Sequence, residues 1–126
     1  MAQESVHMND TLYILNGPNL NLLGVREPHL YGGTTLAQVQ QLCERVTAEL
    51  GYRCDFRQSN HEGVLVDWVQ EARENAAAVV INPAGLSFRS IPLLDALKTL
   101  DQPLAEVHIT NIHRRDPLYQ HSLISL

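Results

Sequence analysis

A polar stretch follows the first apolar run of the chain and holds side chains suited to acid–base chemistry. It covers residues 15–35 and contains Arg26, Tyr31 and three asparagines. A free tyrosine has a pKa of about 10, too high for a base at neutral pH, but an adjacent cation lowers that pKa by favouring the phenolate. Arginine suits this task because it keeps its charge. Both residues lie on one loop, whose closure could bring them together and exclude water.

A histidine near the end of the chain, His108, is the matching candidate for a general acid. Simpler interpretations stand beside these. Tyr31 could be a loop aromatic that packs on a helix, and Arg26 could form a solvated surface pair with Glu27. His108 could be a core histidine that caps a strand. The asparagines of the turns, among them Asn19 and Asn82, could simply tie those turns through side-chain hydrogen bonds.

The polar stretch is bounded by two regular elements. Residues 12–15 form an apolar run, which predicts a buried strand at 11–16. After the loop, Thr34 or Thr35 can cap a helix that ends at Gly51, a natural helix terminator. The apolar residues of this helix recur with a period of 3.6, which predicts one buried face. They are Leu36, Val39, Leu42, Cys43, Val46 and Leu50.

Strands and helices alternate through the rest of the chain. The pattern predicts strands at 52–58, 77–82 and 104–108. A helix is expected at 64–74, after a turn at 59–63, and another after a loop at 83–89, where Ser90 is the cap and Pro92 lies in the first turn. This alternation predicts an α/β fold: a parallel sheet with helices on both faces.

Parallel strands direct attention to one edge of the sheet, because ligands bind beyond the carboxyl ends of the strands in open α/β sheets. Three of the four predicted strands lead into asparagine there, and the fourth delivers His108. Neutral hydrogen-bonding groups at one edge predict a site for a small, polar, oxygen-rich ligand.

Composition excludes several classes of function. The 126 residues suit one domain, expected at 11–126 after a loose tail at 1–10, and 44% are hydrophobic, enough for a packed core. A net charge of −5 without a basic stripe argues against a nucleic-acid partner. No apolar run is long enough to cross a membrane, and no secretory signal is visible. We expect a cytoplasmic protein.

Common cofactor and metal sites are not indicated either. Neither the phosphate-binding GxxxxGK[ST] motif nor the dinucleotide-binding GxGxxG motif is present. His108 and His113 lack metal-ligand spacing. Cys43 and Cys54 form no CxxC pair, and we expect both to be small core residues.

Several motifs spread over residues 12–125 resemble the type II 3-dehydroquinate dehydratase family. The first is long and specific: LNGPNLNLLG at 15–24, followed by REP at 26–28 and YG at 31–32. The others are RQSNHEG at 57–63, INPAG at 81–85, EVHITNIH at 106–113 and HS at 121–122. The resemblance implies a flavodoxin-like, doubly wound parallel sheet in three layers. It also implies a cofactor-free anti elimination of water from 3-dehydroquinate, which gives 3-dehydroshikimate through an enolate.

The resemblance also implies catalytic roles. Tyr31 would remove the proton α to the ketone, and Arg26 would favour its phenolate. Asn19 would hold a water that stabilises the enolate. His108 would protonate the departing hydroxyl group, with Glu106 orienting its ring.

Substrate binding follows in the same way. Asn82 and the backbone of Ile109 and Thr110 would hold the cyclic keto acid. Asp95 would reach the site of a neighbouring subunit, because the family assembles trimers into dodecamers. We therefore expect a homo-oligomer.

Two positions depart from the family pattern. Phe88 stands where the family typically has histidine, and Tyr119 stands where it typically has arginine. Both family residues help to hold the hydroxyl-bearing side of the ring. Their loss leaves two outcomes open: a weak dehydroquinase, or a related hydro-lyase acting on a less hydroxylated cyclic keto acid. A binding relative that has lost turnover is a third, separate interpretation. The family usually also continues with a further strand and helix.

Overall fold

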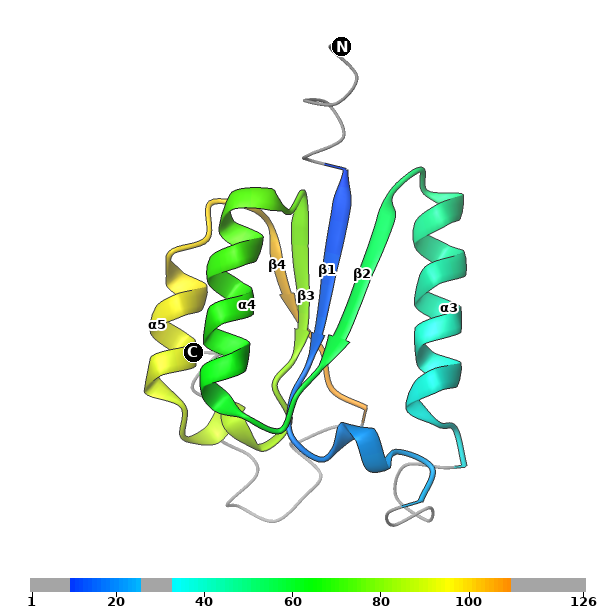
Figure 1. The fold of residues 1–126 in the computed structure, drawn as a ribbon, viewed down its shortest axis with the longest axis horizontal. Coiled ribbons are helices and arrows are strands. Elements are labelled where there is room, and N and C mark those ends of the chain that lie inside the picture. The colour runs from blue at the N-terminus through cyan, green and yellow to red at the C-terminus, as the bar shows by residue number, and fades with distance from the viewer. Residues whose placement is uncertain (1–9, 26–32, 110–126) are drawn as a thin grey trace.

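Four parallel strands form the centre of the structure, a computed structural model that describes residues 10–25 and 33–109, with the side chain of Phe88 excepted. Their order is β2-β1-β3-β4 (Figure 1). They are β1 (Thr11–Asn16), β2 (Arg53–Gln58), β3 (Ala78–Asn82) and β4 (Leu104–Glu106). The register pairs Asn16 with both Gln58 and Asn82, so these three strands end side by side.

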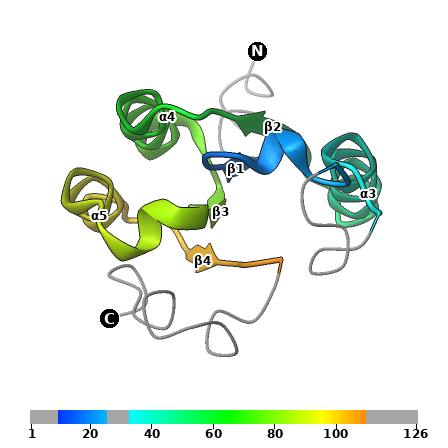
Figure 2. The ribbon, with the colours of Figure 1, turned by 90° about the horizontal axis from the view of Figure 1, so that it is seen from below.

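Helices cover both faces of this sheet, which confirms the predicted three-layer α/β fold. One face carries α3 (Leu36–Glu49), and the other carries α4 (Glu62–Asn75) and α5 (Ile91–Lys98) (Figure 2). Two short 3-10 helices follow β1 and β3 at the carboxyl edge: η1 (Leu20–Leu22) and η2 (Ala84–Phe88). In the described part of the chain, no helix has the length and apolar character that a membrane span requires.

The core lies between the sheet and the pair α4 and α5. Leu15, Leu65, Ile81 and Leu93 are among its fully buried side chains. Burying each such side chain stabilises the fold by about 1.5–3 kcal/mol. This core holds β1 and β3, and with them the residues at their carboxyl ends, in fixed positions.

The predicted helix caps are present. Thr35 accepts a hydrogen bond from the backbone N–H of Gln38 at 3.2 Å, and the Gln38 side chain accepts one from the backbone N–H of Thr35 at 2.9 Å. This reciprocal capping box satisfies two N–H groups at the start of α3. Ser90 caps α5 by accepting from the backbone N–H of Leu93. Gly51 follows α3 with a φ of +85°, where glycine is favoured.

The apolar face predicted for the first helix is only partly buried among the described residues. Leu42, Val46 and Leu50 are 49%, 41% and 64% exposed. The helix α3 packs on β2, which is the edge strand of the sheet, and on η1, so half of its apolar face has nothing in the described chain to cover it. Cys43 and Cys54 are half-buried free thiols rather than core residues, and burial raises the pKa of both.

Element boundaries differ by a few residues from the sequence predictions. The helix α4 begins at Glu62 instead of Val64, because polar residues of its first turn carry no apolar period. The last strand ends at Glu106, although the backbone N–H of Val107 still bonds the carbonyl of Ile81 at 2.9 Å. The loop expected at 83–89 contains η2, and the long first loop contains η1.

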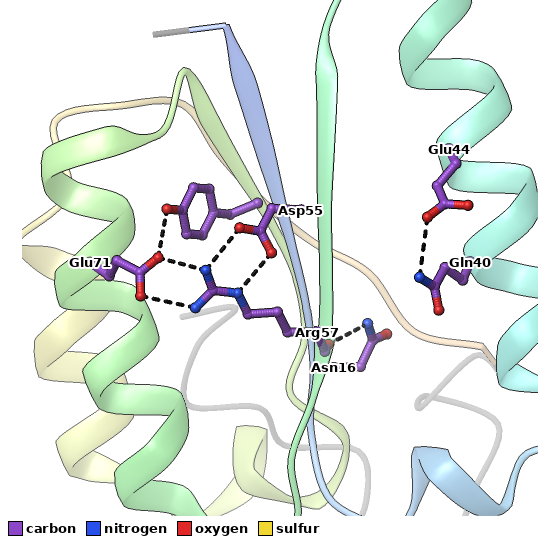
Figure 3. Close-up of polar contacts among 7 residues, drawn as sticks. Asn16, Gln40, Glu44, Asp55, Arg57 and Glu71 are labelled. Atoms are coloured by element: carbon purple, nitrogen blue, oxygen red, sulfur yellow. Dashed lines mark hydrogen bonds and ion pairs between the residues drawn. The ribbon is translucent and has the colours of Figure 1, made fainter. Parts of the chain in front are cut away.

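A charged cluster joins β2 to α4. Arg57 makes paired hydrogen bonds with Asp55 on its own strand and with Glu71 on α4, at 2.5–3.0 Å (Figure 3). Its guanidinium also lies 5.0 Å from the ring centre of Tyr13, whose hydroxyl donates to Glu71. Arg57 lowers the pKa of Glu71, while burial and the Glu71 contact raise the pKa of Tyr13 to about 12. The cluster fixes the end of β2, which leads into the candidate site.

Candidate active site

The carboxyl edge of the sheet gathers the polar residues that the sequence predicts there. Asn16 and Asn82 end neighbouring strands, and both are buried. Beyond β4, the chain continues beside β3 through the bond between Val107 and Ile81, which brings His108 to the same edge. Rigid strands thus position these side chains, and loops between them complete the site.

His108 and Glu106 form a close pair. Nε2 of His108 lies 2.5 Å from Oε2 of Glu106, and the two side chains are only 18% and 11% exposed. They are two residues apart in extended chain, so their side chains lie on the same side of the backbone. A carboxylate on one ring nitrogen fixes the orientation of the imidazole and leaves Nδ1 as the nitrogen that can face a ligand. The arrangement is suited to a general acid.

Asn82 shapes the turn after β3. Its side-chain oxygen accepts a hydrogen bond from the backbone N–H of Ala84 at 3.1 Å, and Ala84 has a φ of 52°. Such an Asx turn uses the oxygen of the carboxamide, so Nδ2 is the group that can donate to a ligand. A left-handed alanine is strained, and strain of this kind concentrates at functional sites.

The loops after β1 and β3 meet at Gly17. Its backbone N–H bonds the carbonyl of Asn82 at 2.8 Å, and a Cβ at this position would lie 2.5 Å from the carbonyl oxygen of Pro83. No real Cβ approaches that closely, so only glycine allows this contact. This close approach fixes the distance between the two loops at the carboxyl edge of the sheet.

We therefore expect Gly17→Ala to destabilise the protein by about 1–3 kcal/mol, because one backbone segment must move. Gly63→Ala is the matched control, since the added Cβ meets nothing within 4 Å and lies in α4. Alanine in a helix is expected to stabilise by about 0.5–1 kcal/mol. Urea unfolding measures both changes. Equal unfolding midpoints for the two variants would show that the Gly17 contact is unimportant.

Asn19 lies in the loop after β1, exposed and in a left-handed conformation with a φ of 71°. Its backbone N–H donates to the side-chain oxygen of Asn60 at 2.9 Å. Gln58 donates to that same oxygen and to the carbonyl of Gly17, each at 3.1 Å. Sequence reasoning assigned no role to Gln58 and Asn60. Their position at the carboxyl end of a predicted strand was the one feature of the sequence that could have indicated a role for them.

The structure describes only some of the other candidate residues. Asp95 is exposed on α5, Phe88 is the last residue of η2, and Ile109 follows His108 directly. In the described ranges, no group of three or more His, Cys, Asp or Glu residues is arranged to hold a metal ion. The remaining candidates lie outside the described residues: Arg26, Tyr31, Thr110 and Tyr119.

Comparison with known proteins gives one consistent result. The family model described as Dehydroquinase class II matches residues 10–126. The 3-dehydroquinate dehydratase of Streptomyces coelicolor is 57% identical over 118 residues, which cover 93% of this chain and 75% of that protein. The 3-dehydroquinate dehydratase 1 of Agrobacterium fabrum is 52% identical over 94% of this chain and 81% of its own length.

Solved structures of similar fold lead to the same family. The type II dehydroquinase from Propionibacterium acnes superposes with a TM-score of 0.89 at 40% identity, over 94% of this chain and 82% of that one. The enzyme from Butyrivibrio crossotus gives a TM-score of 0.89 at 32% identity, over 93% of this chain and 82% of that one. The fold of this chain is therefore that of the solved type II dehydroquinases.

Proposed function

This chain belongs to the class II dehydroquinase family, and from that premise we propose that it removes water from 3-dehydroquinate to form 3-dehydroshikimate, without a cofactor. One observation carries the proposal: relatives named 3-dehydroquinate dehydratase match more than nine-tenths of the chain at 52–57% identity. The part-buried pair of His108 and Glu106 at the carboxyl edge of the sheet supports it, because the reaction needs an acid there.

In the proposed reaction, the phenolate of Tyr31, favoured by Arg26, takes a proton from the carbon next to the ketone. The electron pair of the broken C–H bond moves into an enolate, whose charge a water held by Asn19 stabilises. The enolate then expels the hydroxyl group, which takes a proton from His108 and leaves as water. Glu106 keeps the imidazole in position during this transfer.

Substrate binding is assigned to the same edge. Nδ2 of Asn82 and the backbone N–H groups of Ile109 and Thr110 hold the polar groups of the substrate. Asp95 contributes from a neighbouring subunit in a homo-oligomer, a dodecamer built of trimers. Its exposed position on α5 supports such a contact. Light scattering at assay concentration tests the assembly, and a monomer would contradict it.

The proposed setting is the shikimate pathway in the cytoplasm, with quinate catabolism as the alternative use of the same reaction. Half-buried free thiols at Cys43 and Cys54 fit a reducing compartment.

A second candidate is a related hydro-lyase that acts on a less hydroxylated cyclic keto acid. It is favoured by Phe88 and Tyr119, which replace the histidine and arginine of the family pattern. Steady-state assay on 3-dehydroquinate, following the absorbance of the enone product, separates the two. Efficient turnover supports the dehydroquinase, whereas a folded protein without turnover favours the second candidate.

We expect Phe88→His to raise kcat/KM for 3-dehydroquinate by about 5- to 150-fold, the effect of one regained hydrogen bond of about 1–3 kcal/mol. Phe88→Leu is the control, because it removes the ring without adding a donor, and it should not produce this rise. If the parent chain already turns over 3-dehydroquinate efficiently and Phe88→His does not raise kcat/KM, the loss of the family histidine has not changed substrate specificity.

A further inference from the structure

Asn60 lies outside the chemistry proposed above, yet it holds the backbone of Asn19. We infer that Asn60, supported by Gln58, is a positioning residue for the elimination reaction. This inference rests on the proposed function, in which Asn19 holds the water that stabilises the enolate.

The contacts run from a rigid strand into the first loop. Gln58 is the last residue of β2, and its Nε2 donates to the side-chain oxygen of Asn60 at 3.1 Å and to the carbonyl of Gly17 at 3.1 Å. The Asn60 oxygen also accepts from the backbone N–H of Asn19 at 2.9 Å. One oxygen therefore joins the end of β2 to the start of the loop that follows β1.

The backbone of Asn19 explains why this contact matters. Residues other than glycine rarely adopt a φ of +71°, although asparagine tolerates it better than most. The side chain of Asn19 does not cap η1, so the local backbone does not hold the carboxamide. The left-handed backbone and its bond to Asn60 thus determine where the Asn19 side chain lies. A small displacement of a catalytic group is costly, because a shift of about 1 Å can lower the rate by about 100-fold.

Only the oxygen of the Asn60 side chain makes these contacts, and this gives a sharp test. Asn60→Asp keeps an oxygen at the same place, so kcat should stay within about threefold of the parent value. Asn60→Leu keeps the approximate size but removes the acceptor, and kcat should fall by about 10- to 100-fold. Because Asn60 is exposed, both variants should fold, and thermal unfolding checks this. An equal loss in both variants would overturn the inference.

A double-mutant cycle identifies the residue through which Asn60 acts. Asn19→Ala removes the side chain that is to be positioned, so adding Asn60→Leu should then lower kcat by less than about threefold. A full additional loss in that background would overturn the inference, because the residues would act independently. If Asn19→Ala lowers kcat and Asn60→Leu does not, the proposed function stands and only the inference fails. If Asn19→Ala alone has no effect, the catalytic role of Asn19 is wrong, and the inference fails with it.

Discussion

Replacing His108 with asparagine is expected to lower kcat for 3-dehydroquinate by about 10²- to 10⁴-fold, the usual contribution of a general acid. Asparagine can still donate a hydrogen bond, but it cannot transfer a proton to the departing hydroxyl group. The part-buried contact with Glu106 fixes the orientation of the His108 ring, and under the proposed function this ring supplies the proton. KM should change much less than kcat, because the loss falls on the transition state.

The control for this change is His61→Asn. His61 precedes α4 at the same end of the sheet, and it is exposed and makes no side-chain capping bond. Its replacement should leave kcat within about twofold of the parent value. Equal losses in the two variants would show that a general effect of histidine replacement, and not proton transfer by His108, is responsible.

Replacing Tyr31 with phenylalanine is expected to lower kcat by a comparable factor of about 10²–10⁴, because the ring remains while the base is lost. Arg26→Ala should also lower kcat. It should move the acidic limb of the kcat/KM profile, which reports the Tyr31 pKa because Tyr31 acts as the phenolate, to higher pH, since the phenolate loses its neighbouring cation. The sign follows from charge: a cation favours the ionised phenol and lowers its pKa.

Tyr52→Phe serves as the matched control. Tyr52 is an exposed tyrosine just before β2, at the opposite edge of the sheet from His108. The activity of the Tyr52→Phe variant should equal that of the parent chain. Unchanged turnover in Tyr31→Phe would mean that the assigned base is wrong.

The order of elements follows from local patterns, which explains why sequence alone predicts the sheet. Buried strands such as Ala78–Asn82 are continuous apolar runs, and capping residues such as Thr35 and Ser90 mark the helix starts. A parallel sheet then brings the strand ends to one edge without any further information. The pairing of Glu106 with His108 is also a local consequence, because residues two apart in extended chain share a side.

Contacts between distant loops could not be predicted in this way. The bond from Asn19 to Asn60 joins residues 41 positions apart, and it depends on the path that the first loop takes over the sheet. The approach of Gly17 to Pro83 depends on the spacing of β1 and β3, which no local period encodes. The exposed part of the α3 apolar face is a further feature that local sequence patterns could not predict. Periodicity identifies an apolar face, but only the tertiary arrangement decides what covers it.

The central claim, that Tyr31 removes the α proton and His108 assists the departure of hydroxide, is tested most directly by solvent deuterium exchange. The substrate is incubated in D2O with His108→Asn or with Tyr31→Phe, and the recovered 3-dehydroquinate is examined by NMR. The account predicts deuterium at the carbon next to the ketone with the His108 variant, because the enolate still forms and is reprotonated, and none with the Tyr31 variant. Two results would contradict the account: deuterium exchange catalysed by the Tyr31 variant, or no exchange with either variant.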